Sequence, residues 1–396
     1  MRALLHSLNR FFTSLTLTVV LLALSLVLVF AATLAQTDLG IWAVQQKYFW
    51  SIFVMTRLPG TDLMIPIFPG GYLIGGLLLV NLVAAHAYRF RFEWRKSGIW
   101  LTHFGLILLL LGELFTGIWQ RESLMRLDQG QTKTYSESYR RMELAVIDTT
   151  NPGFDEVVAV PAEALEQAGT IQYPKLPFTI HPTAFYPNST LRMRNQVPNA
   201  APSPADQGFG PGFVAVPQPV TYRQDEDNAP SAFVELAGPE GRIGTWLVST
   251  LLTEPQAFPY QGRTWALMMR PKRTYYPFSV SLLKFSHDRY PGTDIPKNFS
   301  SRVRLQTPDG SVDREVLIFM NNPLRHGGQT FYQAGFENND RTTILQVVRN
   351  PSWQVPYVSC ALMFVGLLIQ FGIHLFGFVR RRAALAAAPA PAPSRP

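Results

Sequence analysis

The chain of 396 residues contains a single cysteine, and charged residues make up only 16% of it. One thiol excludes an internal disulfide framework and any multi-cysteine zinc or iron–sulfur site built by this chain alone. An average soluble domain carries roughly 25% charged residues, whereas 47% of this chain is hydrophobic. The motifs of common soluble enzymes are also lacking, since no glycine-rich phosphate loop, HExxH, CxxC or GxSxG occurs. The composition therefore favours a membrane protein with an additional polar domain.

Four apolar stretches are long enough to cross a bilayer as helices, which takes about 20 residues. They cover residues 11–35, 70–88, 98–119 and 353–380, with the apolar part of the last at 355–379. The first is followed by FAATLAQ, which resembles the cleavage site of a secretion signal. Its apolar run is longer than the 7–15 residues of such signals. We therefore expect it to be retained as a transmembrane helix.

The net charge of +8 comes from segments that flank the spans on one side. Basic residues lie at the N-terminus, in the loop 89–97 and after the last span, whereas the loop 36–69 and the segment 120–352 are each neutral. Because short basic loops stay in the cytoplasm, we expect both termini and the loop 89–97 to be cytoplasmic and the segment 120–352 to lie outside. The membrane topology then explains the positive charge of the chain. We therefore expect no nucleic-acid partner.

The outer segment 120–352 contains short β-branched or alternating runs bounded by Pro, Gly, Asn and Asp, which are typical of strands. These runs are 142–148, 156–160, 244–252, 278–285, 302–306, 315–320 and 342–348. The fold class predicted is an α-helical membrane protein with four transmembrane helices plus a large β-rich extracytoplasmic domain, a sandwich or an open barrel.

Three connecting segments have their own composition. The stretch 186–231, rich in Pro, Asn and Gly, predicts a long surface loop. The aromatic run 41–53 predicts an amphipathic helix at the outer membrane boundary. The Ala- and Pro-rich tail 381–396 predicts disorder in the cytoplasm.

Three histidines lie near the cytoplasmic ends of three different spans: His86, His103 and His374. Imidazole is a common axial ligand of haem iron, so a shared cleft at this depth could hold haem. Each histidine could instead reach the membrane surface, bind a lipid phosphate or cap a neighbouring helix. His103 is the strongest of the three, because Gly105 two residues later could admit a flat ring.

Other polar features are open to two interpretations. Glu113, the carboxylate inside the third span, is either a functional group, a partner in a helix–helix hydrogen bond, or a side chain near the outer rim that water reaches. Cys360 is either an inert thiol or a contact for a redox partner. The stretch 320–336, with its glycine pair and aromatic residues, is either a binding face or a tight turn and a packed strand.

Several segments resemble the ResB (CcsB) family of cytochrome c biogenesis proteins, and the resemblance covers nearly the whole chain. FFTSLTLTVVLLALSL resembles the opening helix of the family, and IPIFPGGYLIGGLLLVNLVAAHAYRF and GIWLTHFGLILLLLGELFTG resemble the second and third spans. FMNNPLRHGGQTFYQAGF is similar to the outer-domain pattern NxPLxxxGxxFYQ, and VVRNPSWQVPYVSCALMFVGLLIQFGIHL resembles the closing span.

This resemblance implies a subunit of the system II cytochrome c synthase in a bacterial cytoplasmic membrane, with the large domain in the periplasm. Such a subunit helps carry haem b, bound transiently and shared with a ResC (CcsA)-type partner, to an apocytochrome c for covalent attachment. The partner's Trp-rich motif is absent here, so the chain would be the unfused subunit and not catalytic alone. A thioredoxin-like thiol reductant is a further candidate partner.

The resemblance also implies roles for particular residues. His103 matches the third-span histidine implicated as an axial haem ligand, whereas His86 and His374 are candidates from their depth alone. The predicted docking residues of the outer pattern are Pro323, Leu324, Gly328, Phe331, Tyr332 and Gln333, and Cys360 is the predicted redox contact.

Two other classes of protein remain open at this point. One is a membrane-anchored β-domain that acts as a scaffold or binding module without a haem site. The other is a quinone-linked cytochrome b, although such proteins usually place histidine pairs at both depths of the membrane, and no outer-depth histidine occurs in these spans.

Overall fold

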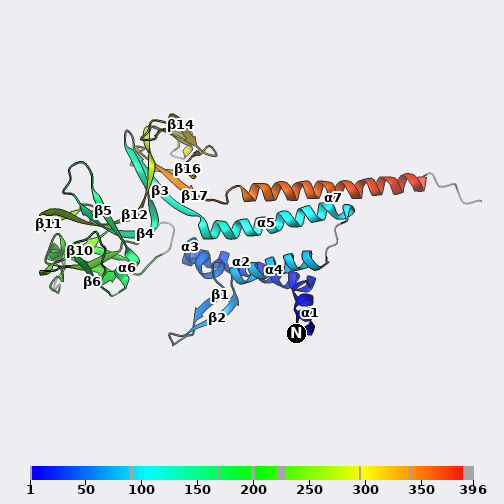
Figure 1. Cartoon of the computed structure of the whole chain (residues 1–396), viewed down its shortest axis with the longest axis horizontal. Coiled ribbons are helices and arrows are strands. Elements are labelled where there is room, and N and C mark those ends of the chain that lie inside the picture. The colour runs from blue at the N-terminus through cyan, green and yellow to red at the C-terminus, as the bar shows by residue number, and fades with distance from the viewer. Residues whose placement is uncertain are drawn as a thin grey trace, which may run out of the picture. The chain divides into compact units, whose positions relative to one another are not determined.

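The computed structural model describes residues 2–89, 93–167, 169–197, 201–221, 228–293, 296–338 and 340–386. The chain forms two compact units (Figure 1). The helical unit comprises Met1–Gln120 and Asn350–Pro396, and the β-rich unit comprises Arg121–Arg349.

Within the described residues, four helices are long and apolar enough to cross a membrane. They are α2 (Leu15–Leu39), α4 (Gly71–Arg89), α5 (Ser97–Trp119) and α7 (Val355–Ala386). Together with the β-rich unit, they confirm the predicted fold class. The helix α7 includes six residues of the segment 381–396, for which the sequence predicts disorder, because these residues, RRAALA, are all good helix formers. Residues 387–396, and part of the predicted basic loop 89–97, lie outside the described residues.

A separate helix, α1 (Arg2–Phe12), precedes the first span, so α2 starts four residues later than predicted. The break is held by the buried Asn81 of α4. Its Nδ2 atom donates hydrogen bonds to the carbonyl oxygens of Phe12, at 2.7 Å, and Ser14, at 3.1 Å. Its Oδ1 atom accepts a hydrogen bond from the Thr18 hydroxyl at 2.6 Å. This amide therefore donates to backbone oxygens at the break, one of which, the Ser14 oxygen, also accepts from the Thr18 backbone N–H at 3.4 Å.

The segment between α2 and α4 differs from the predicted amphipathic helix. The short helix α3 (Ile41–Val44) continues into one π-helical turn, η1 (Gln45–Phe49), and helical structure ends there. A hairpin of β1 (Phe53–Arg57) and β2 (Met64–Pro69) follows and leads directly into α4.

Helices α5 and α7 pack side by side through small residues (Figure 1). Gly98, Gly105 and Gly112 recur every seven residues on α5, and all three are buried. A Cβ atom added to Gly105 would lie 2.7 Å from Met363 Cγ and 2.9 Å from the Ser359 carbonyl oxygen. The glycines thus let the two backbones approach closely, as is common for membrane helices. This observation overturns the idea that Gly105 admits a flat ligand, since the space beside it is filled by α7.

Replacing Gly105 by leucine is expected to force α5 and α7 apart. Overpacking of this kind typically costs about 1–3 kcal/mol, so the midpoint of thermal unfolding in detergent should fall. Gly76→Leu is the matched control, because a Cβ atom added at Gly76 meets no atom within 4 Å. Equal midpoints for the two variants would contradict the assigned packing.

The β-rich unit contains a ten-stranded sheet in which the main path runs β14-β13-β12-β4-β3-β17-β16-β15, with β11 paired to β12 and β5 to β4. Its strands are β3 (Arg121–Asp128), β4 (Thr132–Asp148), β5 (Glu156–Pro161), β11 (Gln256–Tyr260), β12 (Arg263–Arg289), β13 (Pro296–Gln306), β14 (Asp313–Phe319), β15 (Leu324–His326), β16 (Gln329–Glu337) and β17 (Thr342–Arg349). A smaller sheet has the order β10-β9-β6, with β6 (Thr179–Tyr186), β9 (Ser231–Gly238) and β10 (Gly241–Ser249). All seven predicted runs overlap strands, and the runs 244–252 and 315–320 extend past the ends of β10 and β14.

The two larger hydrophobic cores of the β-rich unit both include residues of the long strand β12, and the first also includes residues of β4. The first core joins the small sheet and the short helix α6 (Ala162–Glu166) to β5, β11 and the first half of β12, around Trp246 and Trp265. The second core is enclosed by β3, the second half of β12 and β13 to β17, around Phe278 and Phe331. Both strands shift register between the cores, near Pro271 and Tyr275. The unit therefore consists of two lobes that share two continuous strands.

The predicted loop 186–231 has structure of its own. It contains a hairpin of β7 (Ser189–Met193) and β8 (Phe213–Pro217) and two 3-10 turns, η3 (Arg194–Gln196) and η4 (Gly210–Gly212). The described part of this segment is thus an ordered insertion between β6 and β9, while residues 198–200 and 222–227 lie outside the described residues.

Candidate functional site

The clearest candidate site is a pair of imidazoles held between α4 and α5. His86 lies three residues before the end of α4, and His103 is the seventh residue of α5. The two helices are consecutive and antiparallel neighbours, so these positions face each other across the hairpin. The ring centroids of His86 and His103 are 4.7 Å apart, and the ring planes are inclined by 43°. The structure thus brings together two of the three predicted histidines.

The hydrogen bonds of the pair fix which nitrogen can bind a metal. Nδ1 of His103 lies 2.8 Å from the Ile99 carbonyl oxygen, and Nδ1 of His86 lies 2.8 Å from the Leu82 carbonyl oxygen. A carbonyl oxygen only accepts, so each Nδ1 carries the hydrogen and donates it. In the neutral imidazoles the lone pair is therefore on Nε2. Orientation of a ligating histidine by a hydrogen bond from its other nitrogen is usual in metal sites.

Trp100 completes the cluster, and sequence reasoning missed it. The indole packs edge-on against the His86 ring, with centroids 5.9 Å apart and planes at 80°. Trp100 precedes His103 by three residues on the same helix, a spacing that places two side chains on one face. That spacing was the signal available in the sequence.

His374 behaves differently from the other two histidines. It is exposed on α7, and its Nε2 accepts a hydrogen bond from the Gln370 amide nitrogen, one turn earlier, at 2.9 Å. The lone pair that would bind a metal is thus engaged within α7.

Two axial ligands on opposite faces of one haem iron need more room than the pair provides. Each metal–imidazole bond is about 2 Å long, and the iron atom lies between the two nitrogens, so the ring centroids would be roughly 6 Å apart. The observed separation is 4.7 Å. As arranged here, the pair can supply one axial ligand, from either His103 or His86, and the other must come from elsewhere.

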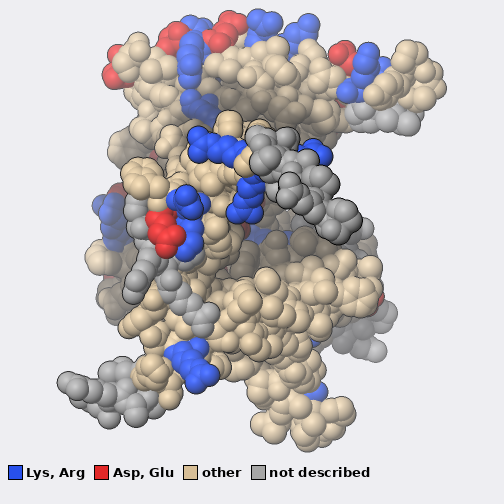
Figure 2. All heavy atoms as spheres, turned by 90° about the vertical axis from the view of Figure 1, so that its right-hand side faces the viewer, with Lys and Arg blue, Asp and Glu red and all other residues tan. Residues whose placement is uncertain are grey.

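Basic side chains lie just before α5 and near the end of α7. Arg95 and Lys96 lie in a 3-10 turn just before α5, with Lys96 Nζ 3.1 Å from a carboxylate oxygen of Glu93, and α7 carries Arg380, Arg381 and Arg382 near its end. Figure 2 views these helix ends, where blue basic side chains stand among tan surface. Haem carries two propionates, so basic side chains at these helix ends suit its polar edge.

The other predicted site residues lie far from this pair in the sequence and have mixed exposure. Leu324 and Phe331 are buried in the second core of the β-rich unit, and they stabilise the fold. Tyr332 is 37% exposed, and the turn glycine Gly328 has a φ of 75°, which favours glycine. Cys360 is a free, exposed thiol near the start of α7. The surface part of the docking prediction thus rests on Tyr332 and its exposed neighbours.

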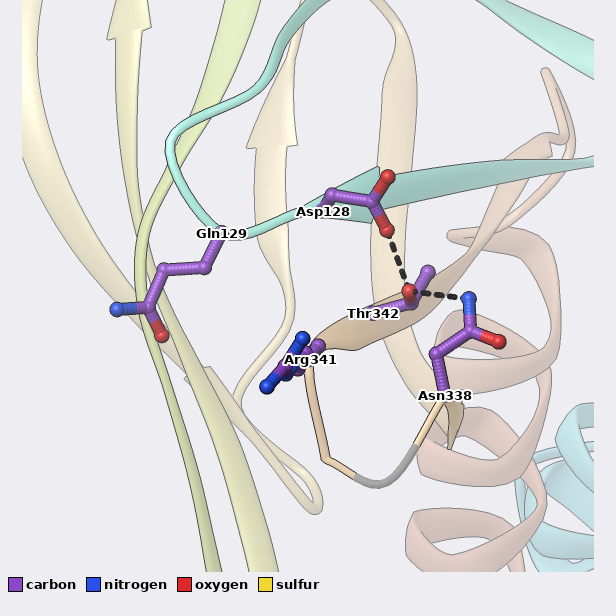
Figure 3. Close-up of a pocket in the computed structure, with 5 residues that line it drawn as sticks. All are labelled: Asp128, Gln129, Asn338, Arg341 and Thr342. Carbon is purple, nitrogen blue, oxygen red and sulfur yellow. Dashed lines mark hydrogen bonds between the residues drawn. The ribbon is translucent and has the colours of Figure 1, made fainter.

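A shallow hollow of about 620 Å³ lies in the β-rich unit, where the β3–β4 turn meets the β16–β17 turn. Asp128 and Asn338 both point to the Thr342 hydroxyl, which donates to Asp128 and accepts from Asn338 Nδ2 at 2.9 Å (Figure 3). These bonds join the two turns, so the polar lining has a structural role.

The fold and the imidazole pair define a membrane protein with a β-rich domain and two oriented histidines between helices. A model of the ResB-like family matches residues 261–344. Protein NrfI of Wolinella succinogenes is 25% identical over 304 residues, which are 74% of this chain and 29% of that protein. The cytochrome c biogenesis proteins CcsB of Synechococcus strains CC9605 and CC9902 are 30% identical over 141 residues and 33% identical over 132 residues.

The chain is thus similar to the ResB-like family over residues 261–344 and to these three proteins over the regions given, which agrees with the resemblance of its motifs. The two CcsB matches cover 32% and 30% of this chain and 31% and 29% of those proteins. The matched regions thus span less than a third of the length of each of these relatives.

Proposed function

We propose that the chain is a subunit of a cytochrome c maturation complex and that α4 and α5 supply an axial ligand to haem in transit. The observation that carries the proposal is the oriented pair His86 and His103, with lone pairs on Nε2 and ring centroids 4.7 Å apart. The printed names of the CcsB relatives, cytochrome c biogenesis proteins, support the same process.

The charge distribution supports the direction of transport. With both termini and the basic loop in the cytoplasm, the histidine pair lies near the cytoplasmic face and the β-rich unit lies in the periplasm. Haem b would enter beside His103 with its propionates toward the basic helix ends. The apolar helix surfaces would limit water around the ring.

The distance between the two histidines also supports a haem site in which this chain and a partner protein each supply one axial ligand. Because His86 and His103 are too close to bind opposite faces of one iron, the second axial ligand would come from a ResC (CcsA)-type membrane protein. The β-rich unit would present the apocytochrome c, whose CxxCH thiols must be reduced to react with the haem vinyl groups. Bond formation would take place on the partner, so this chain is a haem-conveying and scaffolding subunit.

The proposal is tested by co-expressing the chain with its ResC-type partner and measuring haem per purified complex. His103→Ala should lower haem occupancy and shift the reduced spectrum, because Nε2 of His103 is lost as a ligand. His374→Ala is the matched control, since its Nε2 is already engaged by Gln370, and it should match the wild type. Full haem and an unchanged spectrum in His103→Ala would refute the ligand assignment. Absence of haem from an intact wild-type complex would indicate a scaffold.

A further inference from the structure

Glu113 is an acidic side chain in the interior of a membrane-length helix, and its position calls for a partner. It lies on α5 and is exposed. No hydrogen bond or ion pair joins its carboxylate to another residue in the described part of the chain. A charged side chain in hydrocarbon is costly unless it is paired, and such residues usually face protein or water.

The depth of Glu113 keeps it from reaching water easily at the near end of α5. It precedes Trp119, the last residue of the helix, by six positions, or about 9 Å along the axis. Because Cα–Cβ bonds tilt toward the N-terminus of a helix, the side chain leans away from that end and toward the middle of the span. Solvation at the membrane surface is therefore a poor explanation for this carboxylate.

Glu113 lies on a face of α5 that neither neighbouring helix covers. At about 100° per residue, it is roughly 100° around the helix from Gly112, whose face packs on Val355 of α7. It is roughly 80° from His103, whose face meets α4. Gly117 lies one turn further on the same side as Glu113, and a Cβ atom added there would meet no atom within 4 Å. This face therefore combines a carboxylate with a notch into which another helix could pack.

The charge of Glu113 and the missing side chain at Gly117 indicate which kind of helix can pack on this face. A helix that packs at Gly117 and carries a lysine or arginine would both fill the notch and neutralise Glu113. A second copy of this chain offers no such cation at the depth of Glu113, because residues 15–39, 71–88, 97–119 and 355–379, the apolar parts of its four spans, contain no lysine or arginine. Charge complementarity thus favours a different membrane protein.

We propose that the face of α5 formed by Glu113 and Gly117 is the docking surface for a transmembrane helix of the partner that bears a basic side chain. This inference rests on the proposed function, which requires a membrane partner, and it assigns the place where that partner binds. Docking here puts the partner on α5, the helix that carries His103 ten residues earlier.

The test compares recovery of the ResC-type partner with tagged variants of the full chain after co-expression. Gly117→Leu fills the notch and Glu113→Lys reverses the charge, so each is expected to reduce co-purified partner roughly tenfold. Gly372→Leu is the control, since Gly372 lies on α7 and a Cβ atom there also meets nothing within 4 Å. The thermal unfolding midpoint of each variant purified alone should equal that of the wild type.

Unchanged partner recovery in both Gly117→Leu and Glu113→Lys would overturn the proposal, as would an equal loss in Gly372→Leu. A Gly117→Cys variant in a Cys360→Ser background distinguishes the occupants further. A disulfide-linked dimer of this chain as the main product, with the partner present, would assign the face to a second copy and contradict the proposal. The readout is assembly and needs no haem, so its failure is distinguishable from failure of the haem-ligand assignment.

Discussion

Complexes in which both His86 and His103 are alanine are expected to lose haem at least about tenfold relative to wild type, because loss even of a residue that orients a ligand often lowers metal affinity by 10–100-fold. The two ring centroids are 4.7 Å apart, and each Nδ1 donates to a backbone carbonyl, which leaves the lone pair of each neutral ring on Nε2. When His103 alone is removed, His86 is near enough to take over part of its role. Haem content should therefore fall in the order wild type, single variants, double variant.

The order of the single variants identifies the principal ligand. A larger loss in His103→Ala than in His86→Ala assigns the iron to His103, as the family resemblance implies, and the reverse order assigns it to His86. The measurement is haem per complex by absorbance of the pyridine derivative, with partner recovery as the control for assembly. A double variant that assembles and keeps full haem would show that these helices supply no ligand.

Arg270→Met is expected to destabilise the β-rich unit by about 3–5 kcal/mol, the usual cost of leaving one buried charge without its partner. Arg270 Nε lies 3.1 Å from Glu143 Oε1, and the two side chains are only 5% and 4% exposed. They face each other in register on β12 and β4, the two strands that join the lobes. Glu143 would be left buried without its partner next to the first hydrophobic core.

Chemical unfolding of the full chain in detergent, followed by tryptophan fluorescence, measures this effect, since Trp246 and Trp265 are buried in that core. The double variant Arg270→Met with Glu143→Leu should recover most of the loss, because no charge remains to be solvated. Arg304→Met removes an exposed pair with Asp313 and should change stability by less than about 1 kcal/mol. If Arg270→Met also lowers the free energy of unfolding by less than about 1 kcal/mol, the buried pair does not stabilise the β-rich unit as predicted.

The membrane helices and strands could be predicted from the sequence because each depends on local pattern. Apolar runs of bilayer length and alternating β-branched runs are visible without tertiary information. The boundaries were less accurate where a tertiary contact decides them. Asn81, for example, holds the break between α1 and α2 from 67 to 69 positions away in the chain.

The candidate site was predicted only as separate residues at similar depth. Whether His86 meets His103 or His374 depends on which helices pack together and on the rotation of each about its axis. Gly105 shows the same limit, because a glycine beside a histidine suits a ligand cleft or a close helix contact equally well, and here it contacts α7. Glu143 sits in an apolar strand, but its partner Arg270 is 127 residues away, so the pair is visible only in the fold.

The measurement that tests the central claim most directly is rescue of a ligand-deficient complex by free imidazole. In a variant with His103→Gly and His86→Ala, the space left by the His103 side chain can admit an imidazole molecule with the same nitrogen donor. We predict that the complex assembles with little haem and that added imidazole restores haem binding and the reduced spectrum of the wild type. Full haem without imidazole, or an intact complex that imidazole does not restore, would contradict an axial ligand from this helix pair.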